Sequence, residues 1–145
     1  MKELEEKIKS INSQVELLSY YNKMKHCLDV EDYNKAIEIA TLILEIDSNN
    51  KDACRILGLS NIYLKNYQGA ISALQLLEND IPAMMSIGWC YYQLNDLDNA
   101  VSMFEKVIEL DDTYEPAYEA RNSAMIELKA KIIETKEKLK KTKDL

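Results

Sequence analysis

The fold of this chain is decided by three copies of one short motif: Asp32-Tyr-Asn-Lys-Ala36-Ile, Asn66-Tyr-Gln-Gly-Ala70-Ile and Asp96-Leu-Asp-Asn-Ala100-Val. Each copy has a polar residue suited to cap a helix, a large apolar residue, two small or polar residues, an Ala and a β-branched residue. The copies start 34 and then 30 residues apart. A repeat of this length predicts stacked helix pairs, because one pair cannot bury its apolar face alone.

Further positions keep the register of this motif. Twelve residues before the Ala of each copy is a position at which two helices are expected to touch closely, held by Met24, Gly58 and Gly88. Four residues after each Ala come Ala40, Leu74 and Phe104, and seven residues after it come Ile43, Leu77 and Val107. Offsets of four and then three residues mark one face of a helix. The second repeat lacks about one helical turn near its end. We therefore predict an all-α chain in which the second helix of this repeat is shortened.

This pattern resembles the tetratricopeptide repeat (TPR) family, with repeats at residues 17–50, 51–80 and 81–114 and a closing helix from residue 115. Lys23 and Met24 depart from the Leu-Gly that the family usually has in the first helix. The resemblance implies a short right-handed α-solenoid of helix pairs, with a TPR domain over residues 17–126. It also implies a protein–protein interaction module without enzymatic activity.

In a TPR stack, the first helix of each pair lines a concave groove. The resemblance places nine residues of this chain in that groove: Tyr21, Lys25, Arg55, Leu59, Ile62, Tyr63, Met85, Trp89 and Tyr92. The aromatic and Met side chains predict an adaptable apolar surface that accepts a peptide or an amphipathic helix. Two alternatives stay open, in which Trp89 and Tyr92 belong to the core or a terminal helix of the same chain covers them.

Some TPR proteins hold the C-terminal carboxylate of heat-shock chaperones with Lys, Arg and Asn side chains. The positions of this chain that correspond to that clamp hold Tyr21, Lys25, Ile56, Pro82 and Ser86. One cation among five positions does not make a clamp, so we expect an apolar partner instead.

The net charge of −7 is divided unevenly along the chain. From Glu127 onward there are seven Lys against four acidic residues, so we predict a Lys-rich helical tail over residues 127–145. The acidic remainder argues against binding to nucleic acid, whose phosphates it would repel. No segment has the roughly 18 consecutive apolar residues that predict membrane insertion, and no signal peptide is recognised. We expect a cytoplasmic protein.

The N-terminal segment, residues 1–16, is predicted to be an amphipathic helix. Its apolar residues continue into the first repeat at heptad spacing: Leu4, Ile8, Ile11, Val15 and Leu18. This face either caps the first repeat or contacts a second copy of the chain. Ser13 and Glu16 fit a capping box at which a helix could restart. The alternative is one helix from about residue 2 to Asp29.

Catalytic and metal-binding motifs are not found in this sequence. His26 is the single histidine, and Cys27, Cys54 and Cys90 lack the close spacing of metal ligands, so we expect buried reduced thiols and neither a metal nor a cofactor. The function that the sequence favours is an adaptor or scaffold that holds an apolar peptide or amphipathic helix in its groove. The alternatives are a small secretion-type or assembly chaperone that shields apolar client segments, and a self-assembling structural protein joined into a homodimer through its terminal helices.

Overall fold

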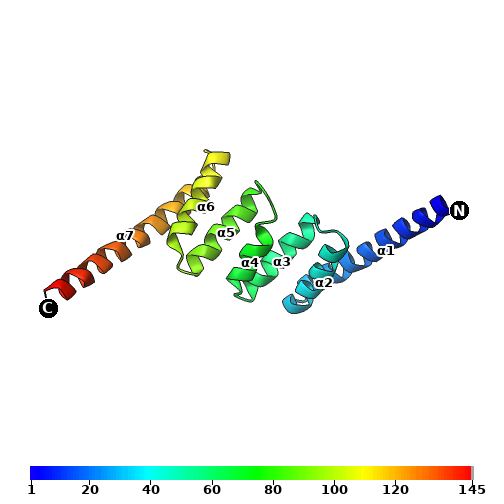
Figure 1. Cartoon of the computed structure of the whole chain (residues 1–145), viewed down its shortest axis with the longest axis horizontal. Coiled ribbons are helices and arrows are strands. Elements are labelled where there is room, and N and C mark those ends of the chain that lie inside the picture. Colours follow the sequence, from blue (N-terminus) through cyan, green and yellow to red (C-terminus); the bar gives the residue numbers. More distant parts are fainter. Residues whose placement is uncertain (145) are drawn as a thin grey trace. The chain divides into compact units, whose positions relative to one another are not determined.

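The structure is a computed structural model that describes residues 1–144 (Figure 1). These residues form seven α-helices and no strand: α1 (Lys2–Asp29), α2 (Tyr33–Ile46), α3 (Lys51–Tyr63), α4 (Tyr67–Leu74), α5 (Ile81–Gln93), α6 (Leu97–Leu110) and α7 (Glu115–Lys143). The chain divides into two compact units, Met1–Leu77 with α1 to α4 and Glu78–Leu145 with α5 to α7. The prediction of an all-α chain is confirmed for the described residues.

The repeated motif forms the same junction between two helices three times. At each junction a residue with positive φ follows the first helix: Glu31 (59°), Lys65 (60°) and Asn95 (62°). The N–H of Lys65 donates to the carbonyl of Ile62, and the N–H of Asn66 donates to the carbonyl of Asn61. The other two junctions repeat this pair of hydrogen bonds. This arrangement is the Schellman motif, which satisfies carbonyls at the end of a helix.

The first residue of each motif then caps the second helix of its pair. The side chains of Asp32, Asn66 and Asp96 accept hydrogen bonds from the backbone N–H groups of Lys35, Gly69 and Asn99, at 3.2, 3.1 and 3.4 Å. Each cap satisfies one of the N–H groups that the first turn of a helix leaves without an intrahelical partner. The capping role predicted for these three residues is confirmed.

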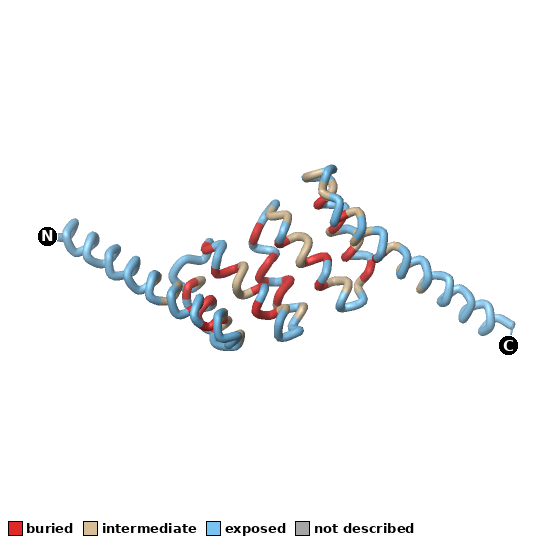
Figure 2. The backbone as a smooth tube through the Cα atoms, turned by 180° about the vertical axis from the view of Figure 1, so that it is seen from behind, coloured by how far each residue is buried: buried red, intermediate tan, exposed pale blue. Residues whose placement is uncertain are grey.

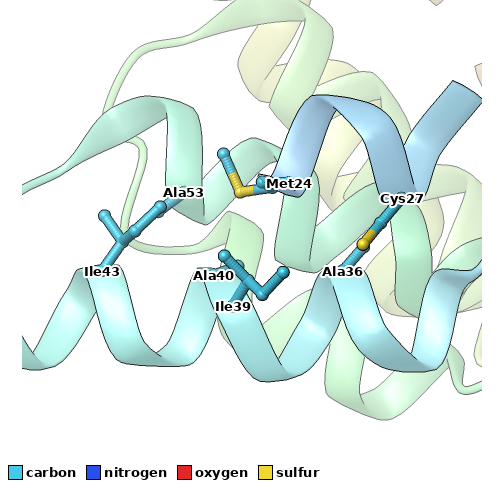
Figure 3. Packing of buried hydrophobic residues seen from close by; sticks show 7 residues of the cluster. All are labelled: Met24, Cys27, Ala36, Ile39, Ala40, Ile43 and Ala53. Atoms are coloured by element: carbon cyan, nitrogen blue, oxygen red, sulfur yellow. The ribbon is translucent and has the colours of Figure 1, made fainter. Parts of the chain in front are cut away.

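The core of the first unit lies where α1, α2 and the start of α3 meet (Figure 3). Its buried residues are Met24, Cys27, Ala36, Ile39, Ala40, Ile43 and Ala53. The four α2 residues among them are spaced by three, one and three positions, so they lie on one face of that helix. Met24, which stands where the other repeats have Gly, is almost completely buried.

The shortened helix of the second repeat is confirmed. α4 has 8 residues, whereas α2 has 14. It still packs on α3, because Gly58 leaves room for Leu74: a Cβ atom at position 58 would lie 2.5 Å from Leu74 Cδ2. Leu77, just beyond the helix, is also buried. Deleting about one turn therefore keeps the apolar face in phase.

In the second unit, α5 packs on α6 and α6 packs on α7. The buried cluster that joins them contains Ala100, Phe104 and Ala124. Gly88 of α5 lies directly against the Phe104 ring, which a side chain at position 88 would displace. Phe104 thus occupies the place that Leu74 has in the first unit, four residues after the Ala of its motif.

Residues 2–16 continue without a break into the first repeat, as part of a single helix that ends at Asp29. Ser13 lies in the interior of this helix, where its hydroxyl donates to the carbonyl of Lys9 at 3.0 Å, so a helix restart at Ser13 is wrong. The predicted cap over the first repeat is also not formed, because this segment is exposed (Figure 2). The expected boundary between residues 16 and 17 falls inside α1.

α7 is a continuous helix of 29 residues, so the expected boundary at residue 127 also falls inside a helix. Its first half packs on α6 through Ala117 and Ala124, which are both fully buried. Beyond Lys131 every described residue is exposed, and Figure 2 shows this stretch in the exposed colour. The exposed part includes three large apolar side chains, Ile132, Ile133 and Leu139.

Candidate peptide-binding site

Six of the nine predicted groove residues belong to the first unit. Tyr21 and Lys25 are on α1, and the other four are on α3: Arg55, Leu59, Ile62 and Tyr63. Lys25, Leu59 and Tyr63 are exposed, and the remaining three are partly buried. Tyr21 packs against the buried cluster of this unit, so it contributes to the core as well as to the surface.

Tyr63 is held in place by an aromatic contact that the sequence did not reveal. Its ring stacks on that of Tyr33, with centroids 4.6 Å apart and planes inclined by 6°. The contact joins the end of α3 to the start of α2. Because Tyr63 is still 65% exposed, the pair offers a fixed aromatic face to solvent.

Arg55 lies beside Asp52, one turn earlier on α3, at 3.5 Å between Nη1 and Oδ1. Both side chains are substantially exposed, so water screens this pair and its effect on stability is small. The pair partly neutralises the cation that Arg55 brings to this surface.

The other three predicted residues, Met85, Trp89 and Tyr92, lie on α5 in the second unit. Trp89 and Tyr92 line an open hollow of about 260 Å³ together with Phe104 of α6 and Ala120 and Ser123 of α7. We call this set of five residues the Trp89 hollow. Trp89 is 43% exposed, so α7 lies beside its ring without covering it.

A hydrogen bond across the second unit fixes one wall of the Trp89 hollow. The hydroxyl of Tyr92 donates to Glu127 of α7, and next to it Lys131 donates to the side-chain oxygen of Asn95. The bond to Glu127 raises the pKa of Tyr92, and partial burial and the negative charge of Glu127 act in the same direction. The bond therefore persists through neutral pH and is lost only as the pH rises above the usual range of tyrosine.

Tyr92 and Met85 also pack against the buried cluster of Phe104. The alternative that Trp89 and Tyr92 belong to the core therefore holds in part for Tyr92. Trp89 is not a member of that cluster. The hollow combines an exposed indole with a floor of apolar atoms from three helices. This combination suits an apolar anchor side chain, because large aromatic rings and buried apolar floors dominate the energetics of protein contacts.

The chemistry of the described residues gives no sign of a reactive centre near this surface. Among residues 1–144, no three His, Cys, Asp or Glu side chains gather closely enough to hold a metal ion. Cys27, Cys54 and Cys90 are all buried, which confirms the predicted burial of the three thiols. Burial raises the pKa of Cys90 to about 11 and also raises that of Cys54, so these thiols carry little thiolate at neutral pH.

Three parts of this surface escaped the sequence analysis. Phe104 was placed only in the core, although one side of its ring reaches the hollow; Ala120 and Glu127 were not assigned to the surface. Ala120 and Glu127 lie three residues before and four residues after Ser123 on α7, and this spacing is the signal that could have found them. The stack of Tyr63 on Tyr33 has no such signal, since it joins two helices.

None of the helices among residues 1–144 is both long enough and apolar enough to cross a membrane.

Comparison with known proteins supports the repeat architecture. The sequence model of the tetratricopeptide repeat family matches residues 81–114. Superkiller protein 3 of Schizosaccharomyces pombe is 31% identical over 80 residues, which cover 52% of this chain and 6% of that protein. The chain thus spans only a small fraction of the length of this curated relative.

Two solved structures share the fold at low sequence identity. The TPR domain of P58(IPK) matches with a TM-score of 0.85 and 22% identity, over 97% of this chain and 40% of the other. The first TPR domain of Spaghetti (RPAP3), bound to the HSP90 peptide SRMEEVD, matches with a TM-score of 0.68 and 21% identity, over 77% of this chain and 92% of the other. Residues 81–114 thus match the sequence model of the tetratricopeptide repeat family, and the described part of the chain has the fold of TPR domains.

Proposed function

We propose that this chain is a non-enzymatic protein–protein interaction module that holds an apolar peptide or an amphipathic helix against α5. The observation that carries this proposal is the Trp89 hollow, an open apolar recess beside the single tryptophan of the chain. Exposed aromatic surface around a recess is typical of contact sites, because leaving it in water is unfavourable.

The size of the Trp89 hollow favours a peptide over a small molecule. Pockets that hold a drug-sized ligand measure roughly 300–1,000 Å³ and enclose most of it. The hollow measures about 260 Å³ and is open to solvent, so it suits one large apolar side chain of a longer partner. An amphipathic helix presents such side chains at spacings of three and four residues, and its polar face stays in water.

The first unit offers a second apolar contact of the same kind. Leu59 and Tyr63 are exposed on α3, and the stack on Tyr33 holds the Tyr63 ring in one orientation. A ring that is already ordered loses little conformational entropy when a partner covers it. Leu59 and Tyr63 are therefore proposed as a contact surface of the first unit in its own right.

The ligand in the RPAP3 structure is an acidic peptide, SRMEEVD. The residues of this chain do not suit such a ligand. Pro82 and Ser86 stand at two of the positions that correspond to the carboxylate clamp, and the chain has a net charge of −7. We therefore propose a partner that is apolar and not acidic, and we expect no measurable binding of SRMEEVD by calorimetry.

The proposal is tested with the emission of Trp89, which reports on its own surroundings because the chain has no other tryptophan. Titration with a designed 18-residue amphipathic Leu/Lys helix should shift the emission to shorter wavelength as the apolar face covers the indole. The same titration followed by calorimetry gives the affinity without an optical probe.

Two matched variants locate the contact. Ser123→Lys places a charge in the hollow and should abolish the shift, whereas Ser102→Lys makes the same change at an exposed position of α6 outside it and should leave the shift intact. Trp89→Ala should abolish binding in calorimetry while far-ultraviolet circular dichroism stays nearly unchanged. Equal binding by the wild-type chain and Ser123→Lys would remove the hollow from the function, and loss of folding in Trp89→Ala would place the indole in the core.

A further inference from the structure

The N-terminal half of α1 carries an apolar face that nothing in its unit covers. Its members are Leu4, Ile8, Ile11, Val15 and Leu18, and we call them the α1 seam. Each of these side chains is between 51% and 62% exposed. From this face we infer that α1 is a self-recognition element, through which two copies of the chain form a parallel coiled-coil dimer.

The first argument is that a helix of this kind needs a partner. Residues 2–16 extend beyond the part of α1 that packs on α2. The packed part of α1 begins at Leu17, the first residue of this helix that is half-buried. In water most helical stability comes from the packing of an apolar face, and short isolated helices are marginal. A helix with five unburied apolar residues in register is therefore stabilised when a second surface covers them.

The second argument is that the α1 seam is free to pair. Counting 100° per residue, the seam lies about 160° around the helix from the residues of α1 that pack into the core, such as Met24 and Cys27. A second helix can lie along the seam without displacing α2 or α3. The same stripe continues past the seam to Asn22, which is also exposed.

The third argument identifies the partner as another α1. With Ile8 and Val15 at heptad position a, Leu4, Ile11 and Leu18 fall at d and Asn22 falls at the next a. β-Branched residues at a with Leu at d favour two parallel strands, and here two of the three d residues are Leu. A single Asn at an a position selects the same state, because two such Asn side chains meet only when the helices are parallel and in register.

The charges of the two exposed helix ends favour pairing of α1 with a second α1 over pairing of α7 with a second α7. Residues 2–25 contain five Lys and four Glu, so two copies of this segment do not repel each other. The exposed end at residues 132–144 has five Lys against three acidic residues, and Thr135 and Thr142 interrupt its apolar row. A second copy of α7 would therefore be repelled and poorly packed.

The buried area is sufficient for a specific contact. Burying one Leu, Ile or Val side chain removes on the order of 100 Å² from water. Five seam residues from each copy then give roughly 1,000 Å² for the pair, which reaches the lower range of specific interfaces. A reversible dimer that depends on protein concentration is the expected state.

Sedimentation velocity on the full chain tests the inference over a range of concentrations. The wild-type chain should show a monomer–dimer equilibrium. The double variant Ile8→Glu/Val15→Glu places four carboxylates in the joined seam and should weaken dimerisation at least about a hundredfold. The matched variant Ile132→Glu/Leu139→Glu makes the same change on α7 and should not alter it. A wild-type monomer at every concentration, or a dimer that only the α7 variant disrupts, would overturn the inference.

Orientation is tested by oxidation of single introduced cysteines, which is practical because the three native thiols are buried. Leu4→Cys places two thiols face to face in a parallel dimer in register and should give a covalent dimer. Glu6→Cys, on the opposite side of the same helix, should not. Cross-linking of Glu6→Cys without Leu4→Cys would exclude the parallel arrangement. This inference is independent of the Trp89 hollow, since Ile8→Glu/Val15→Glu should still bind the amphipathic helix.

Discussion

Gly58 and Gly88 are the residues on which the close packing of the helix pairs depends. A glycine inside a helix is unfavourable by roughly 0.5–1 kcal/mol relative to alanine. Here each glycine lies against the buried side chain of a facing helix, Leu74 or Phe104. The lost helix propensity is offset by the approach of two helices that any Cβ atom would hold apart.

Because these two effects oppose each other, the substitution Gly58→Ala shows which of them is larger. On helix propensity alone, Gly58→Ala would stabilise the chain. Because the added Cβ would lie 2.5 Å from Leu74, we expect overpacking to prevail and the free energy of unfolding to fall by about 1 kcal/mol. Urea unfolding followed by circular dichroism measures this difference.

A double-mutant comparison separates the two effects. In a Leu74→Ala background the crowding is relieved, so Gly58→Ala should no longer destabilise and its propensity gain should emerge. If Gly58→Ala stabilises the wild-type chain as well, the contact between Gly58 and Leu74 does not limit the approach of α3 and α4.

At the scale of an element, the junctions between paired helices store backbone strain. Glu31, Lys65 and Asn95 all have φ near +60°, a conformation that costs an ordinary L-residue roughly 1–2 kcal/mol. The strain persists because the Schellman hydrogen bonds and the cap of the next helix depend on this turn. Asn tolerates the conformation best, so the strain is greatest at Glu31 and Lys65.

Lys65→Gly should therefore stabilise the chain. Relief of the strain stabilises the folded state by more than the extra backbone entropy of glycine stabilises the unfolded state. We therefore expect the free energy of unfolding to rise by about 0.5–1 kcal/mol. Thermal and urea unfolding both report this change. Gln68→Gly, in the first turn of α4, is the control and should destabilise the chain, because Gln68 has no positive φ to relieve and glycine only adds entropy to the unfolded state. A loss of stability in Lys65→Gly would show that the Lys side chain matters more than its backbone.

The elements themselves were largely predictable. The cap residues, the shortened α4 and the buried register positions followed from the motif spacing, because each depends on residues within one or two helical turns. The ends of the chain were less predictable. Neither the capping pattern at Ser13 nor the change to a Lys-rich composition at residue 127 interrupts a helix, since both stretches lack Gly and Pro.

At the scale of the whole molecule, the net charge of −7 should decide which apolar partners arrive fastest. Long-range electrostatic attraction raises association rates most strongly at low ionic strength. Of two amphipathic helices with the same apolar face, the one with Lys on its polar face should associate roughly tenfold faster at low salt than the one with Glu.

Stopped-flow measurement of the Trp89 emission gives both rates. The difference should shrink at high salt, where the Debye length falls to about 3 Å at 1 M. Equal rates for the two peptides at low salt would show that the acidic charge lies away from the surface that the peptide meets. A difference that survives high salt would point to direct charge contacts instead.

The helical class, the spacing of the repeats and their caps could be predicted from the amino-acid sequence, because these depend on local spacing and on residue chemistry that repeats along the chain. Which of the predicted surface residues stay in water depends on the packing of the helices in three dimensions. Tyr92 turns partly into the core and bonds Glu127, Tyr63 stacks on Tyr33, and Trp89 stays exposed beside a recess whose floor is Phe104. These contacts join residues on different helices, so their geometry depends on how the packed helices approach one another, and no local pattern encodes it.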